Sequence, residues 1–234
     1  MIGLRRPDLA QLVRIVGSVV VTVLVVAWGA SPGIGKSTLC AGLSEWLSDA
    51  GLQVDHFQEE EILTRPQYAD VASHFLATGE VERDALLSAT ARFADSVLAA
   101  GTDVVIADAL MPYVPSLLAM GHSEQAITAF MADLADIVAP LRPVMIFLDG
   151  DASAALSRAA ARSEPGWLEW YIGKLARYQV QPEVHDGASA AEYLRRERAI
   201  TLSAVSRQNW GLVLIENATE LTPAEVLHAC RLPA

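Results

Sequence analysis

The sequence predicts an α/β fold of three layers, in which helices cover both faces of a five-stranded parallel sheet. The main observation is that apolar runs alternate along the chain with segments whose apolar residues recur at helical spacing. A second is that the 234 residues, 52% of them hydrophobic, suffice for one sizeable core and include no linker, repeat or low-complexity tract. We therefore expect one domain over residues 1–234.

The expected strands are short apolar segments, as is typical of parallel strands buried on both faces. They are Val19–Val26, Leu52–Phe57, Asp103–Ala107, Val144–Leu148 and Leu212–Ile215. The first belongs to an apolar stretch, residues 15–30, which follows two arginines and could also be interpreted as a secretory signal. Because this stretch is rich in valine and shorter than the ~20 residues of a spanning helix, we favour a buried strand.

Helical spacing and capping residues predict the helices between these strands. The expected segments are Ser37–Ala50, Gln67–Thr78, Glu82–Ala100 and Ser123–Ala139. Ser189–Glu192 and Thr222–Glu225 each match a capping box, so we expect a helix to begin at each of them. Asp151 is expected to cap a further helix after the fourth strand.

Residues 30–38 read Ala-Ser-Pro-Gly-Ile-Gly-Lys-Ser-Thr directly after the first strand, which is the pattern of a phosphate-binding P-loop. Gly33 and Gly35 let the backbone curl tightly, so that successive N–H groups point at phosphate oxygens. Lys36 is placed to neutralise the β- and γ-phosphates, and Ser37 to ligate Mg²⁺. The residues expected to hold the nucleotide here are Ser31, Pro32, Gly33, Ile34, Gly35, Lys36, Ser37 and Thr38.

The net charge and the cysteine content of the chain restrict the kinds of partner that we expect. The formal net charge is -11, so binding to nucleic acid through phosphate neutralisation is not expected. Cys40 and Cys230 match no metal-binding spacing, and the histidines form no ligand set, so we expect a reduced cytoplasmic protein without a membrane partner.

The order of these motifs resembles the nucleoside and nucleotide kinase group of P-loop proteins, of the thymidylate-kinase and deoxynucleoside-kinase type. The resemblance implies a P-loop NTPase fold with a helical lid at about residues 152–180, and ATP and Mg²⁺ as cofactors. It also implies a carboxylate after the second strand that acts as base or orients the acceptor hydroxyl. Glu59, Glu60 and Glu61 stand there, and we favour Glu59, the nearest to the strand end.

Other positions gain roles through the same resemblance. Asp108 closes the third strand and is assigned to the Mg²⁺ shell or to orienting the acceptor. Arg158 and Arg162 are similar to the lid arginines that lie over the transferring phosphoryl group. Asn217 and Ala218 lie in a segment that looks like the adenine-packing loop.

The acceptor is expected to contact Glu60, Tyr68, Phe75 and Tyr113. The sequence departs from the nucleotide-kinase pattern at Asp108-Ala109, where that group has an Asp-Arg pair. We therefore expect a neutral or cationic acceptor, with a nucleoside or a nucleoside-like natural product or antibiotic as the leading class. The alternatives are a nucleoside-monophosphate kinase and, in another class, a P-loop ATPase or switch that acts with a protein partner. A homodimer is one possible assembly.

Overall fold

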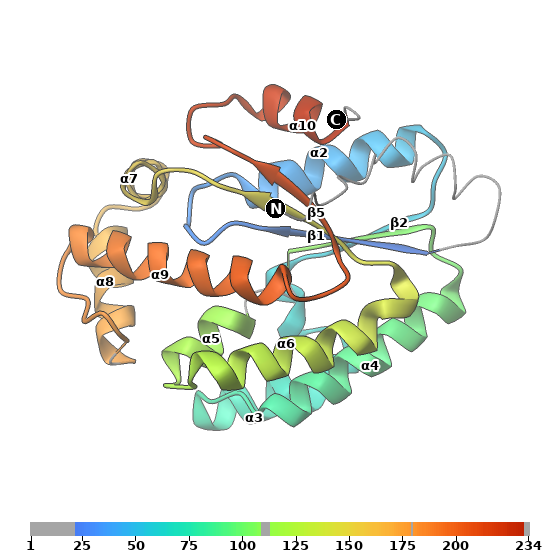
Figure 1. Cartoon of the computed structure of the whole chain (residues 1–234), viewed down its shortest axis with the longest axis horizontal. Helices are drawn as coiled ribbons and strands as arrows, with labels where there is room; N and C mark the ends of the chain where they lie inside the picture. The colour runs from blue at the N-terminus through green and yellow to red at the C-terminus, as the bar shows by residue number, and fades with distance from the viewer. Residues whose placement is uncertain (1–21, 109–112, 179, 232–234) are drawn as a thin grey trace.

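The computed structural model describes residues 22–108, 113–178 and 180–231, which form one five-stranded parallel sheet with helices on both faces (Figure 1). The strands are β1 (Val23–Trp28), β2 (Val54–Phe57), β3 (Val104–Ala107), β4 (Val144–Leu148) and β5 (Gly211–Ile215). Their order across the sheet is β2-β3-β1-β4-β5. The α/β fold with a five-stranded parallel sheet is thus confirmed.

The first strand differs from its predicted bounds. It begins at Val23 and continues to Trp28, whereas the pattern predicted Val19–Val26. Thr22 lies outside the strand, and residues 19–21 of the prediction lie outside the described residues. The register explains the later end, because Ala27 and Trp28 still pair with Ile146 and Phe147 of β4.

Successive side chains of β1 point to opposite faces of the sheet, so the strand feeds two apolar layers. Val23, Val25 and Ala27 pack with the face covered by α2 (Lys36–Asp49) and α10 (Pro223–Arg231). Leu24, Val26 and Trp28 pack with the opposite face. The helices that bury that second face include α4 (Arg83–Ala100), α6 (Glu124–Val138) and α9 (Gly187–Val205).

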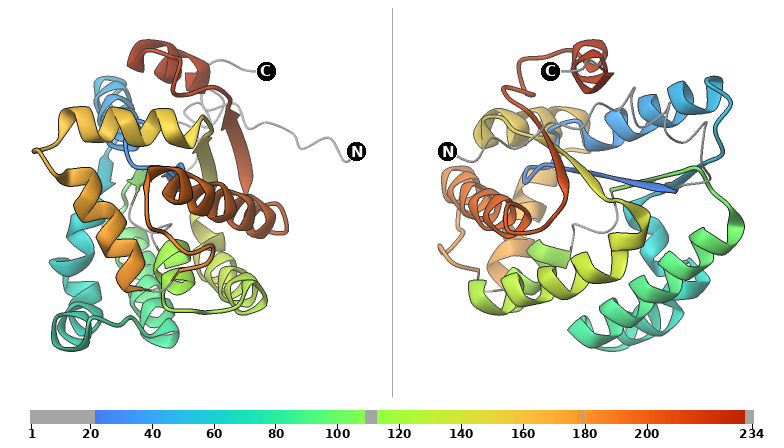
Figure 2. Two further views of the ribbon diagram at one scale, coloured as in Figure 1. Left: turned by 90° about the vertical axis from the view of Figure 1, so that its left-hand side faces the viewer. Right: turned by 45° about the vertical axis from the view of Figure 1, so that its right-hand side comes forward.

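The remaining helices lie around this second face and at the carboxyl ends of the strands (Figures 1 and 2). They are α3 (Ala69–Thr78), α5 (Tyr113–Ala119), α7 (Ala152–Arg162) and α8 (Trp167–Arg177), with short 3-10 turns at Glu59–Leu63, Pro66–Tyr68 and Ala139–Leu141. Segments α7 and α8 fall within the predicted lid and are helical. In the part of the chain that is described, none of the helices combines the length and apolarity needed to cross a bilayer.

The capping predictions have mixed outcomes. Asp151 caps α7 and accepts a hydrogen bond from the amide of Ala154 at 2.7 Å. Thr222 and Glu225 form the expected reciprocal box before α10. The box predicted at Ser189 is wrong, because Asp186 is the N-cap and Ser189 stands at the third helical position. The carboxylate of Asp186 accepts the Ser189 amide at 2.8 Å and so starts the helix earlier.

Candidate active site

The P-loop joins the end of β1 to the start of α2 and follows the geometry that the motif predicts. Gly33 and Gly35 have φ values of 79° and 112°, a region in which an L side chain is strained. A Cβ on Gly33 would also lie 2.4 Å from the carbonyl oxygen of Ala155 and 2.9 Å from the amide nitrogen of Ala159. Helix α7 therefore rests directly on the loop, and only glycine fits between them.

The loop offers the hydrogen-bond donors that a phosphate chain requires. Among the described residues, the amides of Gly35, Lys36, Ser37 and Thr38 donate to no backbone carbonyl, and the first bond of this end of α2 runs from Leu39 to Gly35 at 3.0 Å. Free N–H groups and the positive end of the helix dipole together form an anion site. This arrangement fits the phosphates of a nucleotide.

Lys36 is the first residue of α2 and follows the P-loop glycines directly. Its Nζ donates a 3.1 Å hydrogen bond to the carbonyl of Gly29 and lies 4.9 Å from the centre of the Trp28 ring. Burial lowers the pKa of Lys36, while the nearby carboxyl groups of Glu59, Glu197 and Asp108 oppose that shift. The ammonium is therefore held within reach of the loop by short contacts, ready to exchange carbonyl oxygens for phosphate oxygens.

Two cavities open on different sides of the P-loop. The first has a volume of about 260 Å³ and is lined by Gly33, Ile34, Gly35, Thr38, Leu39, Arg158, Arg162, Ala218, Leu221, Pro223 and Val226. The second has a volume of about 350 Å³, and Pro32 and Lys36 belong to its lining. Different residues of the loop therefore line a cavity beside α7 and the segment after β5 and a cavity whose lining comes largely from α3, α5, α8 and α9.

Arg158 and Arg162 line the first cavity, together with Ala218. The guanidinium of Arg158 donates to the carbonyl of Thr219 and so ties α7 to the segment after β5. Asn217 adopts a positive φ of 54° and is not among the lining residues, whereas Ala218 is held by a 2.7 Å bond from its amide to the Asp149 carbonyl. The two arginines thus stand beside the site predicted for the nucleotide, away from the cavity that Lys36 lines.

The second cavity combines charged and aromatic side chains from distant parts of the chain. Its lining includes Trp28, Lys36, Glu59, Phe75, Tyr171, Lys174, Tyr178, Tyr193 and Glu197. Glu59 comes from the turn after β2, Tyr171 from α8 and Glu197 from α9. This is the space in which an acceptor could meet the transferring phosphoryl group.

The three consecutive glutamates have separate surroundings. Glu59 lines the second cavity, and burial raises the pKa of its carboxyl group. Glu61 receives Arg65 at 2.9 Å and the Gln58 amide at 2.9 Å, so it organises the turn. Glu60 is exposed, as Glu59 also is, but it lines neither cavity, which corrects its assignment as an acceptor contact. Of the three glutamates, only Glu59 lines the second cavity.

Asp108 directly follows β3 and is 6% exposed. Its Oδ1 has no hydrogen-bond partner among the described residues, and burial raises the pKa of the carboxyl group. An unpaired buried carboxylate oxygen fits a role toward a hydrated Mg²⁺, with the exposed Ser37 at the start of α2 as a second oxygen donor.

The structure also places two unexpected side chains beside Asp108. One ligand atom each from Cys40, His56 and Asp108 lies within 4.8 Å of the others. No spacing in the sequence indicated this cluster, because its members come from α2, β2 and the end of β3.

Two predicted acceptor contacts are wrong, because both tyrosines belong to the core. Tyr68 is 0% exposed, and its hydroxyl lies 3.3 Å from that of Thr90. Tyr113 is 2% exposed and packs edge-on against Phe130, with ring centres 6.0 Å apart. Phe75 does line the second cavity. A large aromatic residue near a site can either pack in the core or contact a ligand, and its exposed fraction distinguishes the two roles.

Helix α9 supplies functional candidates that sequence patterns did not indicate. Tyr193 and Glu197 are four residues apart and share one helix face toward the second cavity. Glu197 is 3% exposed, and burial raises its pKa to about 8. The only signal was an acid enclosed by arginines at residues 195–198, which is typical of an exposed helix face.

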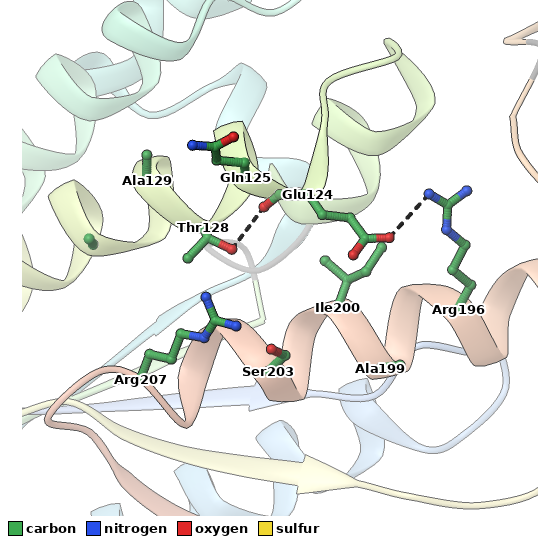
Figure 3. Close-up of a pocket in the computed structure, with 10 residues that line it drawn as sticks. Glu124, Gln125, Thr128, Ala129, Arg196, Ala199, Ile200, Ser203 and Arg207 are labelled. Atoms are coloured by element: carbon green, nitrogen blue, oxygen red, sulfur yellow. Dashed lines mark hydrogen bonds and ion pairs between the residues drawn. The ribbon is translucent and has the colours of Figure 1, made fainter.

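A third hollow lies elsewhere in the described structure. It is a groove of about 630 Å³ between α6 and α9, and it contains no P-loop residue (Figure 3). Glu124 and Arg196 point toward each other across it at 3.2 Å.

Comparison with known proteins gives a distant structural likeness only. No family model and no curated protein matches the chain. Among solved structures, the thymidylate kinase from Ehrlichia chaffeensis is similar in backbone course, with a TM-score of 0.49 and 13% sequence identity over 91% of this chain and 99% of that chain. Neither value is high enough to carry the activity of that enzyme over to this chain.

Proposed function

We propose that this protein is an ATP- and Mg²⁺-dependent phosphotransferase that phosphorylates a hydroxyl of a small molecule. The observation that carries the proposal is the position of the P-loop and Lys36 between two cavities. The cavity lined by Arg158, Arg162 and Ala218 suits the base and ribose of a nucleotide, and we call it the nucleotide cavity. The cavity lined by Lys36, Glu59 and Glu197 suits an acceptor, and we call it the acceptor cavity. A phosphotransferase needs both sites to meet at the γ-phosphate.

Different residues of the chain would bind the phosphates, line the nucleotide site and act on the acceptor hydroxyl. The amides at the start of α2 and Lys36 hold the phosphates, and Arg158 and Arg162 flank the nucleotide cavity. Mg²⁺, when bound by Ser37 and Asp108, would neutralise charge on the phosphates. Glu59 is the carboxylate in the acceptor cavity and would take the proton of the attacking hydroxyl.

The lining of the acceptor cavity favours an acceptor without a phosphate group. Among the described residues its only cationic side chains are Lys36 and Lys174, and it includes no arginine. The sequence has Ala109 directly after Asp108, where the resembled nucleotide kinases have an arginine. A phosphorylated acceptor would require paired cations to offset its desolvation. A nucleoside or nucleoside-like compound therefore remains the leading acceptor class.

The test is a screen of neutral, cationic and phosphorylated hydroxyl compounds for ATP consumption and for a mass gain of one phosphoryl group. Lys36→Ala should fold normally and lose at least about a hundredfold in kcat, because the lost charge acts on the transferring group. Arg177→Ala removes one positive charge from an exposed position on α8 and should keep full activity.

Three outcomes would overturn the proposal. Transfer to nucleoside monophosphates alone would indicate the nucleotide-kinase alternative. Release of free phosphate without any acceptor would indicate an ATPase or switch. Equal turnover by wild type and Lys36→Ala would remove the P-loop from the reaction altogether.

A further inference from the structure

Glu197 is a buried acid whose burial is only partly offset by the positive charge of nearby Lys36. It stands in the middle of α9, is 3% exposed and lines the acceptor cavity. Among the described residues, its carboxyl group accepts no hydrogen bond and forms no ion pair within 4 Å. An acid buried in this way is costly to the fold unless a ligand pairs with it. Glu197 therefore needs an explanation that packing does not supply.

Two polar side chains that line the same cavity as Glu197 are also buried without a hydrogen-bond partner among the described residues. The groups concerned are the hydroxyl of Tyr193 and the indole N–H of Trp28. Both line the acceptor cavity, as do Tyr171 and Tyr178 of the segment around α8. Aromatic faces attract cations, and a carboxylate among them completes the usual set for recognising an organic ammonium group.

Neither lysine in the cavity lining forms an ion pair with Glu197. Lys36 of α2 donates to the carbonyl of Gly29 and belongs to the phosphate site. Lys174 of α8 is exposed, and its Nζ lies 5.6 Å from the ring centre of Trp170, which is 54% exposed and outside the cavity lining. The ammonium of Lys174 thus lies toward the rim. The lining of the cavity includes two carboxyl groups, that of the buried Glu197 and that of Glu59, which is exposed.

We propose that the acceptor carries a protonated amine, which Glu197 binds among the aromatic side chains of the cavity while the acceptor hydroxyl is directed to Glu59 and the P-loop. This inference rests on the proposed function and names its substrate class. Glu197 acts in recognition, and Glu59 acts on the reacting hydroxyl.

The charges that face Glu197 give the proposal a pH signature. They are Lys36 from α2 and Glu59 from the turn after β2, with the phenols of Tyr171 from α8 and Tyr193 from α9. Burial raises the pKa of Glu197 to about 8, so in the empty site it holds a proton at neutral pH. An ammonium group pairs with the ionised form. Binding below pH 8 must therefore release a proton, and affinity should rise with pH between 6 and 8, by at most about tenfold per unit.

The experiment measures binding of matched probes to the full chain by calorimetry. The probes are 2-amino-1-phenylethanol and 3′-amino-3′-deoxyadenosine, each compared with its N-acetyl derivative. We expect at least one amine to bind ten times more tightly than its acetylated form, with proton release at pH 7. Glu197→Gln should abolish that preference. Glu192→Gln, the same change at an exposed position of α9, should preserve it.

Several results would overturn the inference: equal affinity for an amine and its acetylated form, a preference that survives Glu197→Gln, or no binding of either amine at 10 mM. The pH dependence of wild-type binding supplies a readout that does not depend on folding of the variant. Amine binding without any ATP-dependent transfer would overturn the proposed function alone. Transfer to neutral acceptors without amine preference would overturn this inference alone.

Discussion

At the scale of single residues, Glu59 and Glu60 form a natural matched pair. They are adjacent and carry the same charge, but only Glu59 lines the acceptor cavity. Glu59→Gln should lower kcat by roughly a hundredfold, the range for a lost proton acceptor, whereas Glu60→Gln should stay within about twofold. Steady-state kinetics of the two variants measures the difference. A dead Glu60→Gln beside an active Glu59→Gln would reverse the assignment.

We expect Glu59 to determine the pH dependence of kcat as well. Burial raises the pKa of Glu59, so its proton-accepting form is lost already at a pH above the usual range of a glutamate. The wild-type rate should therefore rise with pH through that raised pKa, and the rising limb should vanish in Glu59→Gln.

At the scale of elements, the contact between α7 and the P-loop can be separated from glycine's conformational role. Gly33 and Gly51 both have positive φ, 79° and 86°, but a Cβ on Gly51 would meet nothing within 4 Å. Gly51→Ala should cost about 1 kcal/mol and leave nucleotide binding unchanged. Gly33→Ala also collides with Ala155, so it should displace the loop or α7 and weaken ATP binding at least about tenfold.

Thermal melting and nucleotide titration of both variants check this prediction. Equal nucleotide affinity in the two variants would mean that α7 can shift away from the loop without consequence for the phosphate site. In that case the close approach seen at Ala155 and Ala159 would be packing alone.

At the scale of the whole molecule, one sheet joins two apolar layers, so the expected single domain should unfold in one transition. MgATP at about a hundred times its Kd should stabilise the protein by about 2.7 kcal/mol and raise Tm by roughly 5–10 °C. Lys36→Ala should reduce that shift. Calorimetry with two separate transitions, of which only one responds to nucleotide, would contradict a single domain.

The sequence by itself determined the fold class and the phosphate loop. Strand positions were predictable because parallel strands are continuous apolar runs, as at Val144–Leu148, where predicted and observed bounds agree. The P-loop was predictable because its chemistry lies in contiguous residues whose spacing is fixed. Asp108 and Glu59 could be proposed for a related reason, since Asp108 directly follows β3 and Glu59 lies two residues after the end of β2.

Only the tertiary structure decided which side chains line the acceptor cavity. Glu197 and Tyr193 lie about 160 residues from the P-loop, and no local pattern distinguishes an acid that faces a cavity from one that faces water. The same limit misplaced Tyr68 and Tyr113, whose aromatic character suits a pocket and a core equally. Burial depends on which helices pack together over the sheet, and that packing is set by the whole chain.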